Sequence, residues 1–590
     1  MPLRQDKTPH AQHFVEAALP LPFRHTFTYR IPDAMLGTIS IGARMIVPFG
    51  KRHLTGYAVA LHETFTETHE LKETDIREII EVTDTEPLIT AEIMSLAKWT
   101  ADYYATSWGE VLKATLPAGI NAAVESFYAI TDKGRVALKS NGGQTAAKWK
   151  ILTAIRDAEE TSRHDLAREF GDAPSKRAIR ELARLGFISA SDRSVSSKVK
   201  PKIRKSVKLM PDRAENATKP LSDQQSAIVD ALRGAGGEML FTDLLEHANV
   251  GASPITTLAK RGYLEISVRE VMRDPLADAA ALGASPIKLN EDQSEVLSEV
   301  VKALKTAEYK GFLLHGVTGS GKTEVYIRAM HAALEMGKCS LMMVPEIALT
   351  PIFSRRLRAV FGSDVAILHS NLSPGERFDE WRRIRAGEAR IVIGTRSAVF
   401  APLECVGLII VDEEHDGSYR QNESPFYSAR DVAVKRAHSA DAVIVLGSAT
   451  PALETYHNAQ IGKYHYLRLK DRIGGRPMAK AELIDMRGVF KRAGKDVVLS
   501  PQLVAAINET HAKGEQSIVL LNRRGFSSFV LCRSCGESLR CKNCDITLTY
   551  HKLDRRLVCH YCSYTTQTPE KCPFCESEYL YFIGRGTEQL

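Results

Sequence analysis

Residues 316–323 have the sequence Gly-Val-Thr-Gly-Ser-Gly-Lys-Thr, which fits G-x-x-x-x-G-K-[ST], the phosphate-binding P-loop. The glycines allow the backbone to curl so that its N–H groups face inward and form an anion-binding nest. Lys322 is expected to reach the β- and γ-phosphates of ATP, and the Thr323 hydroxyl to bind Mg²⁺. A glycine-rich turn without a ligand is the weaker alternative, because a strand-like run precedes the motif and an apolar-patterned helix follows it. The predicted nucleotide contacts are Gly316, Val317, Thr318, Gly319, Ser320, Gly321, Lys322 and Thr323.

An acidic pair follows a second apolar run. Residues 408–411 are Leu-Ile-Ile-Val, a continuous apolar stretch typical of a buried parallel strand, and they lead directly into Asp412 and Glu413. We expect Asp412 to hold the Mg²⁺ shell, and Glu413 to orient and deprotonate the attacking water. An acidic loop after a core strand is the alternative, which the upstream P-loop disfavours. The predicted catalytic group is therefore Lys322, Thr323, Asp412 and Glu413.

Two weaker motifs gain meaning beside the P-loop. Gln293 precedes a predicted helix ahead of the P-loop, and its amide carries both a donor and an acceptor with which it could bind the adenine edge. Residues 447–451, Gly-Ser-Ala-Thr-Pro, follow another apolar strand and could relay the phosphate state to a bound DNA strand. Alone, the first would be a common surface glutamine and the second an ordinary turn.

Eight of the ten cysteines lie between residues 532 and 575 as four C-x-x-C pairs. Eight thiolates make two tetrahedral Cys₄ zinc sites with no ligand left over. Without a secretory signal, such a cluster indicates metal binding rather than disulfides. The five residues between the first two pairs make a tight link, whereas the 14 between the second and third are close to zinc-ribbon spacing. We predict a nested pairing, with interleaved pairing as the alternative. The inner site would be Cys541, Cys544, Cys559 and Cys562, and the outer site Cys532, Cys535, Cys572 and Cys575.

Length and composition indicate a multidomain globular protein. The 590 residues suggest about four domains, and 44% hydrophobic with 25% charged residues is an ordinary balance. A net charge of +7 permits a nucleic-acid partner without requiring one. No apolar run approaches the roughly 18 residues of a membrane helix, and the N-terminus has no apolar signal core. We therefore expect a cytoplasmic protein that does not engage a membrane.

The elements before the P-loop fall into two regions. Residues 13–61 alternate short apolar runs with turn residues, which predicts a small β domain, and residues 91–107 have helical periodicity. Residues 179–188 and 255–264 form an internal repeat in which an apolar-faced helix ends in a basic residue, a glycine and an aromatic residue. This pattern is typical of the last helix and wing of a winged-helix unit, for which DNA binding and structural docking are equally good interpretations. The basic stretch 193–208 is expected to be a linker.

The order of the motifs resembles that of superfamily 2 helicases. The motifs are the P-loop and residues 344–350, 394–397, 412–415 and 447–450. Residues 416–427 resemble the aromatic-rich loop that couples DNA contact to ATP hydrolysis in some of these motors. Base stacking would explain its aromatic residues, and a packing loop is the alternative. The resemblance implies DNA contacts by Thr395, Arg396, Tyr419 and Arg420.

The double zinc module inside the second helicase lobe, after residues 520–526, narrows the resemblance to the PriA family of bacterial replication restart helicases. Residues 584–588 also match that family's Gly-x-Gly-Thr-Glu element. The resemblance covers essentially the whole chain and implies that the N-terminal domain binds the 3′ end of a nascent strand at a fork. The implied contacts are Phe27, Thr28, Gly50 and Arg77. Thr28 stands where the family usually has aspartate, and Arg77 where lysine is frequent, so Thr28 can hydrogen-bond but brings no carboxylate.

The chain given ends at Leu590, whereas the family continues with late lobe-2 motifs. These include arginines that stabilise charge on the transferred phosphate, worth about 10³–10⁵ in rate. We therefore expect either a fragment or a weak ATPase. The main hypothesis is a 3′-to-5′ DNA helicase that acts at stalled forks and D-loops and promotes loading of the replicative helicase. The alternatives are a fork-binding scaffold that binds ATP with little turnover, and another zinc-bearing translocase.

Together these features predict a multidomain α/β fold with an N-terminal β domain, a winged-helix region, and RecA-like helicase lobes with an inserted double zinc-binding module. The expected domains are 1–117 (3′-end-binding β domain), 118–276 (winged-helix region), 277–475 (helicase lobe 1), 476–531 (start of lobe 2), 532–577 (zinc module) and 578–590 (lobe 2 continuation). The expected cofactors are ATP, Mg²⁺ and two Zn²⁺ per chain. The resemblance implies branched and single-stranded DNA, primosome proteins and single-stranded DNA-binding protein as partners.

Overall fold

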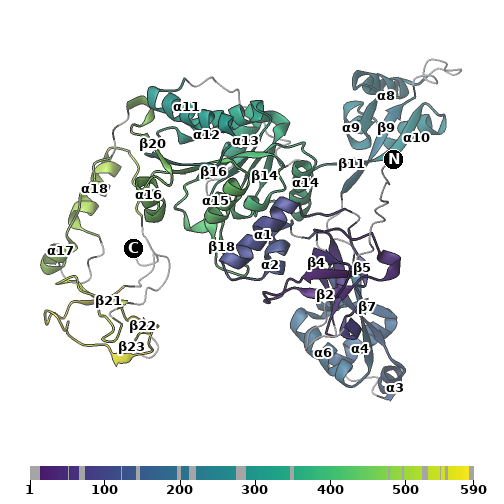
Figure 1. The fold of residues 1–590 in the computed structure, drawn as a ribbon, viewed down its shortest axis with the longest axis horizontal. Helices are drawn as coiled ribbons and strands as arrows, with labels where there is room; N and C mark the ends of the chain where they lie inside the picture. The colour runs from purple at the N-terminus through teal and green to yellow at the C-terminus, as the bar shows by residue number, and fades with distance from the viewer. Residues whose placement is uncertain are drawn as a thin grey trace, which may run out of the picture. The chain divides into compact units, whose positions relative to one another are not determined.

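In the computed structural model the chain forms two compact units, Met1–Arg476 and Pro477–Leu590 (Figure 1). The structure describes residues 13–50, 52–65, 73–84, 86–117, 119–120, 123–140, 147–195, 201–210, 221–273, 275, 288–345, 351–475, 477, 479–493, 497, 499–520, 529–544, 546–551 and 556–583. Three predicted motifs lie wholly or partly outside these residues. They are 346–350 in the second helicase motif, most of 520–526, and 584–588.

The first unit begins with a five-stranded antiparallel sheet. Its strands are β1 (Phe14–Ala18), β2 (Phe27–Arg30), β3 (Arg44–Phe49), β4 (Arg52–His62) and β5 (Glu81–Val82), in the order β2-β1-β4-β3-β5. Val15, Met45 and Val47 are buried in one core because alternate side chains of a strand point to the same face. The sheet confirms the predicted N-terminal β domain.

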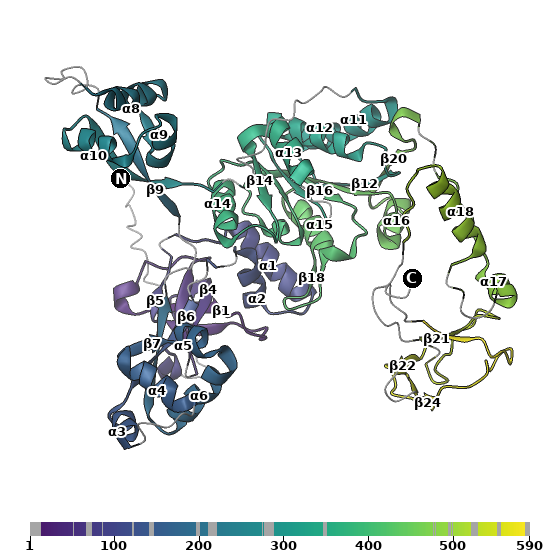
Figure 2. The same cartoon turned by 180° about the vertical axis from the view of Figure 1, so that it is seen from behind.

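Two helices pack this sheet against the helicase domain. They are α1 (Ala91–Tyr103), which lies within the predicted helical stretch 91–107, and α2 (Trp108–Thr115), which lies beyond that prediction. Their buried residues, such as Ile93 and Leu112, belong to the same core cluster as Val432 of α15 (Ala429–Ser439). Figures 1 and 2 both place α1 beside α15. The N-terminal domain and the helicase domain therefore share a core.

Residues 123–271 form two units whose described elements follow the same order, except that the first unit also contains the helix α3 after its first strand. The first contains β6 (Ala123–Ile130), α3 (Asp132–Ser140), α4 (Ala147–Asp157), β7 (Glu160–Ser162), α5 (Arg163–Phe170), α6 (Asp172–Arg184) and β8 (Ile188–Val195). The second contains β9 (Lys202–Leu209), α8 (Asp223–Gly234), β10 (Glu238–Leu240), α9 (Phe241–His247), α10 (Ala252–Lys260) and β11 (Leu264–Val271). Their sheets have the equivalent orders β7-β6-β8 and β10-β9-β11. Gly186 and Gly262, with φ of +71° and +79°, end the last helix of each unit in the same left-handed turn.

The prediction that residues 193–208 form a basic linker is wrong for most of this stretch. Strand β8 extends to Val195, and β9 is the central strand of the second sheet. In β9, Val207 and Leu209 are buried whereas Lys208 between them is exposed. Strand β9 pairs with β11, which lies more than 50 residues later in the chain. The strand therefore could not be recognised from the charged composition of residues 193–208 alone.

The helicase domain is built on a seven-stranded parallel sheet with the order β14-β15-β13-β16-β19-β12-β20. The strands are β12 (Lys310–Gly316), β13 (Cys339–Met343), β14 (Val365–Leu368), β15 (Ile391–Gly394), β16 (Val406–Asp412), β19 (Val443–Ser448) and β20 (His465–Leu469). Helices α11 (Glu291–Thr306), α12 (Lys322–Glu335), α13 (Pro351–Phe361), α14 (Pro374–Arg385), α15 and α16 (Leu453–Gln460) accompany it. Parallel strands bring their carboxyl ends to one edge, so the loops after β12, β16 and β19 meet there. This sheet confirms the predicted RecA-like lobe.

The second unit contains two helices and a small antiparallel sheet. The helices are α17 (Met486–Ala493) and α18 (Pro501–Ala512), and the strands are β21 (Phe529–Cys532), β22 (Thr549–His551), β23 (Arg556–Val558), β24 (Thr565–Gln567) and β25 (Leu580–Ile583). The sheet order is β24-β23-β22-β21-β25. The apolar core beside it is small and centres on Val530, Leu539, Leu548 and Leu557, together with cysteines.

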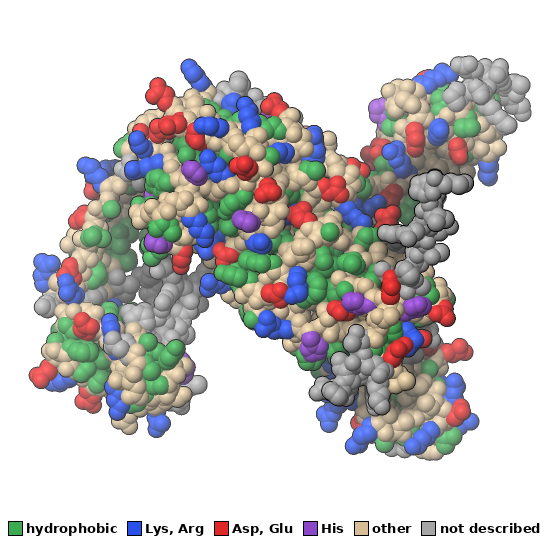
Figure 3. Space-filling view, viewed as in Figure 1, with side chains coloured by type: hydrophobic (Ala, Val, Ile, Leu, Met, Phe, Trp, Pro, Cys, Tyr) green, Lys and Arg blue, Asp and Glu red, His purple; other side chains and the backbone are tan. Residues whose placement is uncertain are grey.

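Helix hydropathy and surface charge bear on what the protein can bind. Among the described helices, none is long and apolar enough to cross a bilayer. On the face seen in Figure 3, basic and acidic side chains are mixed over the helicase elements rather than separated. The net charge of +7 therefore does not by itself locate a DNA-binding surface, which has to be argued from individual contacts.

Candidate functional site

The predicted P-loop connects β12 to α12 and folds around Lys322. Gly319 and Gly321 have φ of +83° and +84°, a left-handed conformation that glycine adopts without strain. Lys322 is buried, and its Nζ donates a 2.9 Å hydrogen bond to the carbonyl of Gly316. Thr323 follows in the first turn of α12 and is half-buried. The loop has the curl that a phosphate nest requires.

The acidic pair lies beside this loop. Asp412 is the last residue of β16, and Glu413 Oε1 lies 3.6 Å from Lys322 Nζ. Burial raises the pKa of Asp412, and the negative charge of Glu413 raises it further. A bound Mg²⁺ would act in the opposite direction by favouring the carboxylate. The structure thus brings together Lys322, Asp412 and Glu413, as the sequence predicted them to be placed.

Two tyrosines hold Asp412, a role that the sequence predicted for neither: Tyr419 was expected to contact DNA, and Tyr326 was not singled out. The hydroxyl of Tyr326, on α12, donates a 3.0 Å hydrogen bond to Asp412 Oδ1, and that of Tyr419 donates a 2.6 Å bond to the Asp412 carbonyl. A Cβ at Gly447, near the end of β19, would come within 1.7 Å of the Tyr326 hydroxyl, so this position needs glycine. A tyrosine on the apolar face one turn after the P-loop lysine was the available signal.

A hydrogen-bond network links the acidic motif to the turn after β19. Glu414 is buried and accepts hydrogen bonds from Ala452 N at 2.7 Å and Thr455 Oγ1 at 2.8 Å. His415 Nδ1 lies 2.8 Å from Ser448 Oγ. Glu413 itself has a φ of +46°, a strained conformation for a residue other than glycine and common at functional sites. Side chains inside the two motifs therefore connect them, although the sequence assigned no individual role to Glu414, His415 or Ser448.

Gln293 lies against the P-loop. Its Nε2 donates a 2.9 Å hydrogen bond to the Ser320 carbonyl, and its Oε1 accepts one from Asn290 N at 3.0 Å in the capping box of α11. A Cβ at Gly321 would come within 2.3 Å of Nε2. The glutamine thus touches the nucleotide loop, although both ends of its amide are bonded within the protein.

The groups at this edge fit ATP and Mg²⁺. Ser320 Oγ is buried in the P-loop and has no hydrogen-bond partner among the described residues, as expected of a group that awaits a ligand. Lys322 supplies positive charge for phosphates, and the Asp412 carboxylate and Thr323 hydroxyl are oxygen ligands of the kind that Mg²⁺ prefers. When bound, Mg²⁺ would neutralise charge that develops on the phosphates.

The aromatic-rich loop is more buried than predicted. Tyr419 is only 2% exposed and is bonded to Asp412, which contradicts its predicted role in base stacking. Thr395 is also buried, and Arg396 Nη1 donates a 3.1 Å hydrogen bond to the carbonyl of Arg420. Phe426, with 52% of its surface exposed, is the aromatic of this loop that is open to solvent. Sequence alone could not separate these tyrosine and phenylalanine positions.

Three of the four predicted contacts in the N-terminal domain lie together. Arg77 Nη1 donates a 2.9 Å hydrogen bond to the Gly50 carbonyl, and the rings of Phe27 and Phe49 are 5.3 Å apart. Phe49 directly precedes Gly50, so Phe27, Gly50 and Arg77 share one end of the sheet. Thr28 pairs with Glu16 and points to the opposite face from Phe27, since successive strand residues alternate.

The eight cysteines form two groups of four. Within each group the Sγ atoms lie within 4.8 Å of one another, and the groups are Cys532, Cys535, Cys572, Cys575 and Cys541, Cys544, Cys559, Cys562. This confirms the nested pairing and rejects the interleaved one. The backbone N–H of Tyr564 lowers the pKa of the Cys562 thiol to about 6, which favours the thiolate that binds zinc. Two closed Cys₄ sites fit Zn²⁺ in a structural role.

Three segments of the chain match known family models. Residues 16–117 match the 3′ DNA-binding domain, residues 290–459 the DEAD/DEAH box helicase, and residues 541–566 the PriA DNA helicase Cys-rich region. These segments cover the N-terminal sheet with α1 and α2 almost completely, the parallel helicase sheet except β20, and the inner zinc site. The Asp412 and P-loop elements both fall inside the second match.

Relatives match nearly the whole chain. Replication restart protein PriA of Bacillus subtilis is 37% identical over 574 residues, 96% of this chain and 68% of that protein. The PriA proteins of Synechocystis and Haemophilus influenzae are 36% and 32% identical, over 96% and 98% of this chain and 68% and 67% of their own lengths. With the domain matches and the two zinc sites, these identities show that the chain is a DNA helicase that belongs to the replication restart protein PriA family.

Proposed function

We propose that the edge of the parallel sheet around Lys322 hydrolyses ATP and that this drives 3′-to-5′ movement along DNA. Lys322 binds the β- and γ-phosphates, Thr323 and Asp412 hold Mg²⁺, and Glu413 positions the attacking water. The observation that carries this assignment is the 3.6 Å approach of Lys322 Nζ to Glu413 Oε1 beside the glycine curl. The strained φ of Glu413 supports a role at the reacting atoms.

We further propose that the end of the N-terminal sheet captures the 3′ terminus of a nascent strand. Phe27 presents an aromatic ring on which a terminal base can stack, and Arg77 presents a cation. The Gly50 carbonyl, which accepts from Arg77, holds that cation at the same end of the sheet as the ring. Thr28, without a carboxylate, contributes at most a hydrogen bond.

The contacts between α1 and α15 support recognition of branched DNA. Tyr104 OH donates a 2.9 Å hydrogen bond to Asp431, and Arg436 Nε donates a 2.8 Å bond to Glu92. Arg436 is fully buried, so the pair is costly to separate. A 3′ end held by the N-terminal sheet is therefore held at a fixed place relative to the motor, which favours stalled forks and D-loops over plain duplex.

Partners and compartment follow from the same assignment. The relatives are replication restart proteins by name, and we propose that this chain likewise promotes primosome assembly and loading of the replicative helicase. Primosome proteins and single-stranded DNA-binding protein are the proposed protein partners, and the cytoplasm is the proposed compartment.

The test is unwinding of forks that differ only at the nascent leading strand. Wild-type protein should unwind a fork with a 3′ hydroxyl at the junction faster than a fork lacking that strand. Lys322→Ala should bind both forks but unwind neither, whereas Lys302→Ala, an exposed lysine on α11, should behave as wild type. Equal unwinding by Lys322→Ala and wild type would refute the motor assignment.

The 3′-end site is tested separately. Phe27→Ala should remove the preference for the 3′ hydroxyl fork while leaving the DNA-free ATPase unchanged. Tyr103→Ala, which removes an exposed aromatic ring on α1, is the matched control and should keep the preference. A preference retained by Phe27→Ala would place terminal recognition elsewhere.

A further inference from the structure

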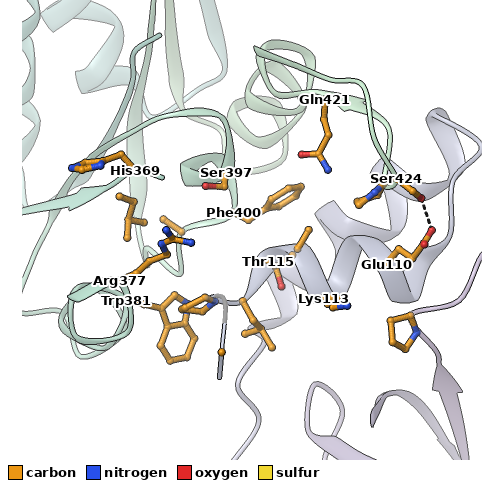
Figure 4. Close-up of a pocket in the computed structure, with 18 residues that line it drawn as sticks. Glu110, Lys113, Thr115, His369, Arg377, Trp381, Ser397, Phe400, Gln421 and Ser424 are labelled. Carbon is orange, nitrogen blue, oxygen red and sulfur yellow. Dashed lines mark hydrogen bonds between the residues drawn. The ribbon is translucent and has the colours of Figure 1, made fainter. Parts of the chain in front are cut away.

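A pocket of about 540 Å³ lies between α2 of the N-terminal domain and the helicase domain (Figure 4). Figure 4 shows Lys113 and Thr115 on the α2 side, with Arg377, Trp381 and Phe400 on the helicase side. Its volume is in the range of ligand-binding pockets. Neither the predicted nucleotide contacts nor the predicted 3′-end contacts line it.

The walls of the pocket are fixed by packing and by one bond across the two domains. Trp381 and Phe400 are almost fully buried in the core cluster shared with α2. Ser424 Oγ donates a 2.6 Å hydrogen bond to Glu110 Oε2, drawn as a dashed line in Figure 4. Ser424 belongs to the aromatic-rich loop, so that loop forms one rim. The pocket is therefore preformed, which reduces the entropic cost of filling it.

Polar groups are presented at its edge. Lys113 is exposed on α2, and Gln421 comes from the aromatic-rich loop. Arg377 is held in place because its Nη2 donates to the carbonyls of Ser370 and Leu372 at 3.0 and 3.1 Å. Its Nε is buried and has no hydrogen-bond partner among the described residues. A guanidinium fixed in this way places a positive charge at the pocket wall, which suits an anionic oxygen.

The chemistry of the pocket favours a nucleotide within a DNA strand. Its two strong cations, Lys113 and Arg377, outnumber the one acid, Glu110, and apolar side chains form much of the remaining wall. A nucleotide needs both features, because its phosphates are anionic and its base has an apolar face. The pocket also joins a segment that matches a 3′ DNA-binding domain to one that matches a helicase.

We propose that this pocket holds one nucleotide of a single DNA strand that crosses the helicase domain, with Lys113 and Arg377 neutralising the phosphates on either side of it. The proposal rests on the proposed function, since it extends the path of the translocated strand onto α2. It gives the N-terminal domain a second DNA contact, made to the single strand rather than to a 3′ terminus. Because Ser424 and Gln421 belong to the aromatic-rich loop and line the pocket, a nucleotide bound in the pocket contacts that loop.

The first experiment measures binding of a fluorescent dT₂₀ strand, which has no fork, to the full chain over a range of salt concentrations. Lys113→Gln should weaken binding about fivefold at 0.1 M salt and reduce the slope of log K against log [salt] by about 0.7, because one phosphate contact is lost. Lys98→Gln, an exposed lysine on α1 outside the pocket, is the matched control and should change neither value. An unchanged slope for Lys113→Gln would overturn the proposal.

A second variant tests the volume of the pocket without changing charge. Ala114→Trp, on α2, should also weaken binding of dT₂₀ while the slope stays at the wild-type value, provided the thermal unfolding midpoint is unchanged. Wild-type affinity for dT₂₀ in a folded Ala114→Trp protein would reject the pocket as a strand site.

Two further outcomes distinguish this proposal from the alternatives of a free-nucleotide site and of the 3′-end site. If dTMP binds wild type but not Lys113→Gln while dT₂₀ affinity is unaffected, the occupant is a free nucleotide and the proposal is wrong. The preference for a 3′ hydroxyl fork should persist in Lys113→Gln, because Phe27 and Arg77 are untouched. If wild type fails to bind dT₂₀ at all, the proposed motor function fails as well, a result distinct from a defect confined to Lys113→Gln.

Discussion

Whereas the charged side chains of the nucleotide site are bonded to other groups of the protein, the thiols of the zinc module face one another. Lys322 Nζ is held by the Gly316 carbonyl at 2.9 Å, and Asp412 by Tyr326 at 3.0 Å. In the zinc module, Cys541 and Cys562 Sγ atoms lie 3.6 Å apart. A neighbouring thiol brings neither opposite charge nor a strong hydrogen bond, and the backbone N–H groups that point at these sulfurs, such as Asn543 N at 3.4 Å from Cys541 Sγ, do not replace a metal ion.

This contrast indicates which site persists without its ligand. The nucleotide site is anchored to a large parallel sheet with extensive core clusters on both faces, so it should be formed before ATP binds. The zinc module has a small core in which the cysteines themselves are members. Structural zinc contributes an apparent binding free energy of about 10–16 kcal/mol at neutral pH, which in such modules is folding free energy.

The largest expected effect is therefore loss of zinc. Cys541→Ser removes one of four thiolates from the inner site, and we expect the zinc content to fall from two ions per chain to one or fewer, with unfolding of the module. Elemental analysis gives the metal content, and limited proteolysis reports the unfolding. Cys405→Ser, at an exposed cysteine outside both groups, is the control and should keep both ions. If Cys541→Ser retained two ions per chain, the zinc module would not depend on all four thiolates, and the contrast with the nucleotide site would be wrong.

Removal of the P-loop lysine should have a large effect of a different kind. Lys322→Ala should lower DNA-stimulated ATP hydrolysis by at least about 100-fold, because charge stabilisation at the phosphates is lost. The thermal unfolding midpoint should change little, since the sheet does not depend on the lysine. Phosphate release and a thermal melt on the same sample provide the measurement. A protein that unfolds on this substitution would show that the nucleotide site is not preformed.

These two sites also show what sequence could and could not predict. The P-loop, Asp412 and the cysteine pairs were found because each motif is defined by spacing within a few residues. Their surroundings are set by distant parts of the chain. Tyr326 reaches Asp412 across 86 positions, and Glu414 bonds to Thr455, so local patterns could not indicate either pairing.

The errors have the same physical origin. Tyr419 was expected on the surface, but tertiary packing buries it and directs its hydroxyl to the Asp412 carbonyl. The basic stretch before Leu209 was expected to be a linker because a run of charges is visible in the local sequence. Its pairing with β11 involves residues far along the chain and is not visible there. Spacing therefore predicted the chemistry, while burial and strand pairing had to come from the structure.

An intermediate effect is expected at Tyr326. Tyr326→Phe keeps the ring but removes the hydroxyl that positions Asp412, and hydrogen bonds to charged groups contribute about 1.5–3 kcal/mol. We expect the Mg²⁺ concentration for half-maximal ATPase to rise about tenfold, with binding of Mg²⁺-free nucleotide unchanged. Tyr464→Phe is the control, since this buried tyrosine packs on Gly311 at the opposite end of β12. An unchanged Mg²⁺ dependence would mean that Asp412 is positioned by β16 alone.

The smallest effect is expected from Gln293→Ala, which tests whether a contact to the P-loop adds to the capping role of this glutamine. Gln293 and Gln225 occupy equivalent capping-box positions in α11 and α8, yet only Gln293 also bonds to the P-loop, through the Ser320 carbonyl. Neutral hydrogen bonds contribute about 0.5–1.5 kcal/mol, so Gln293→Ala should raise the KM for ATP roughly threefold to tenfold. Gln225→Ala should cost similar stability but leave the KM unchanged. If both substitutions leave the KM at its wild-type value, Gln293 is a helix cap and no more, because loss of a cap alone would not alter the nucleotide loop.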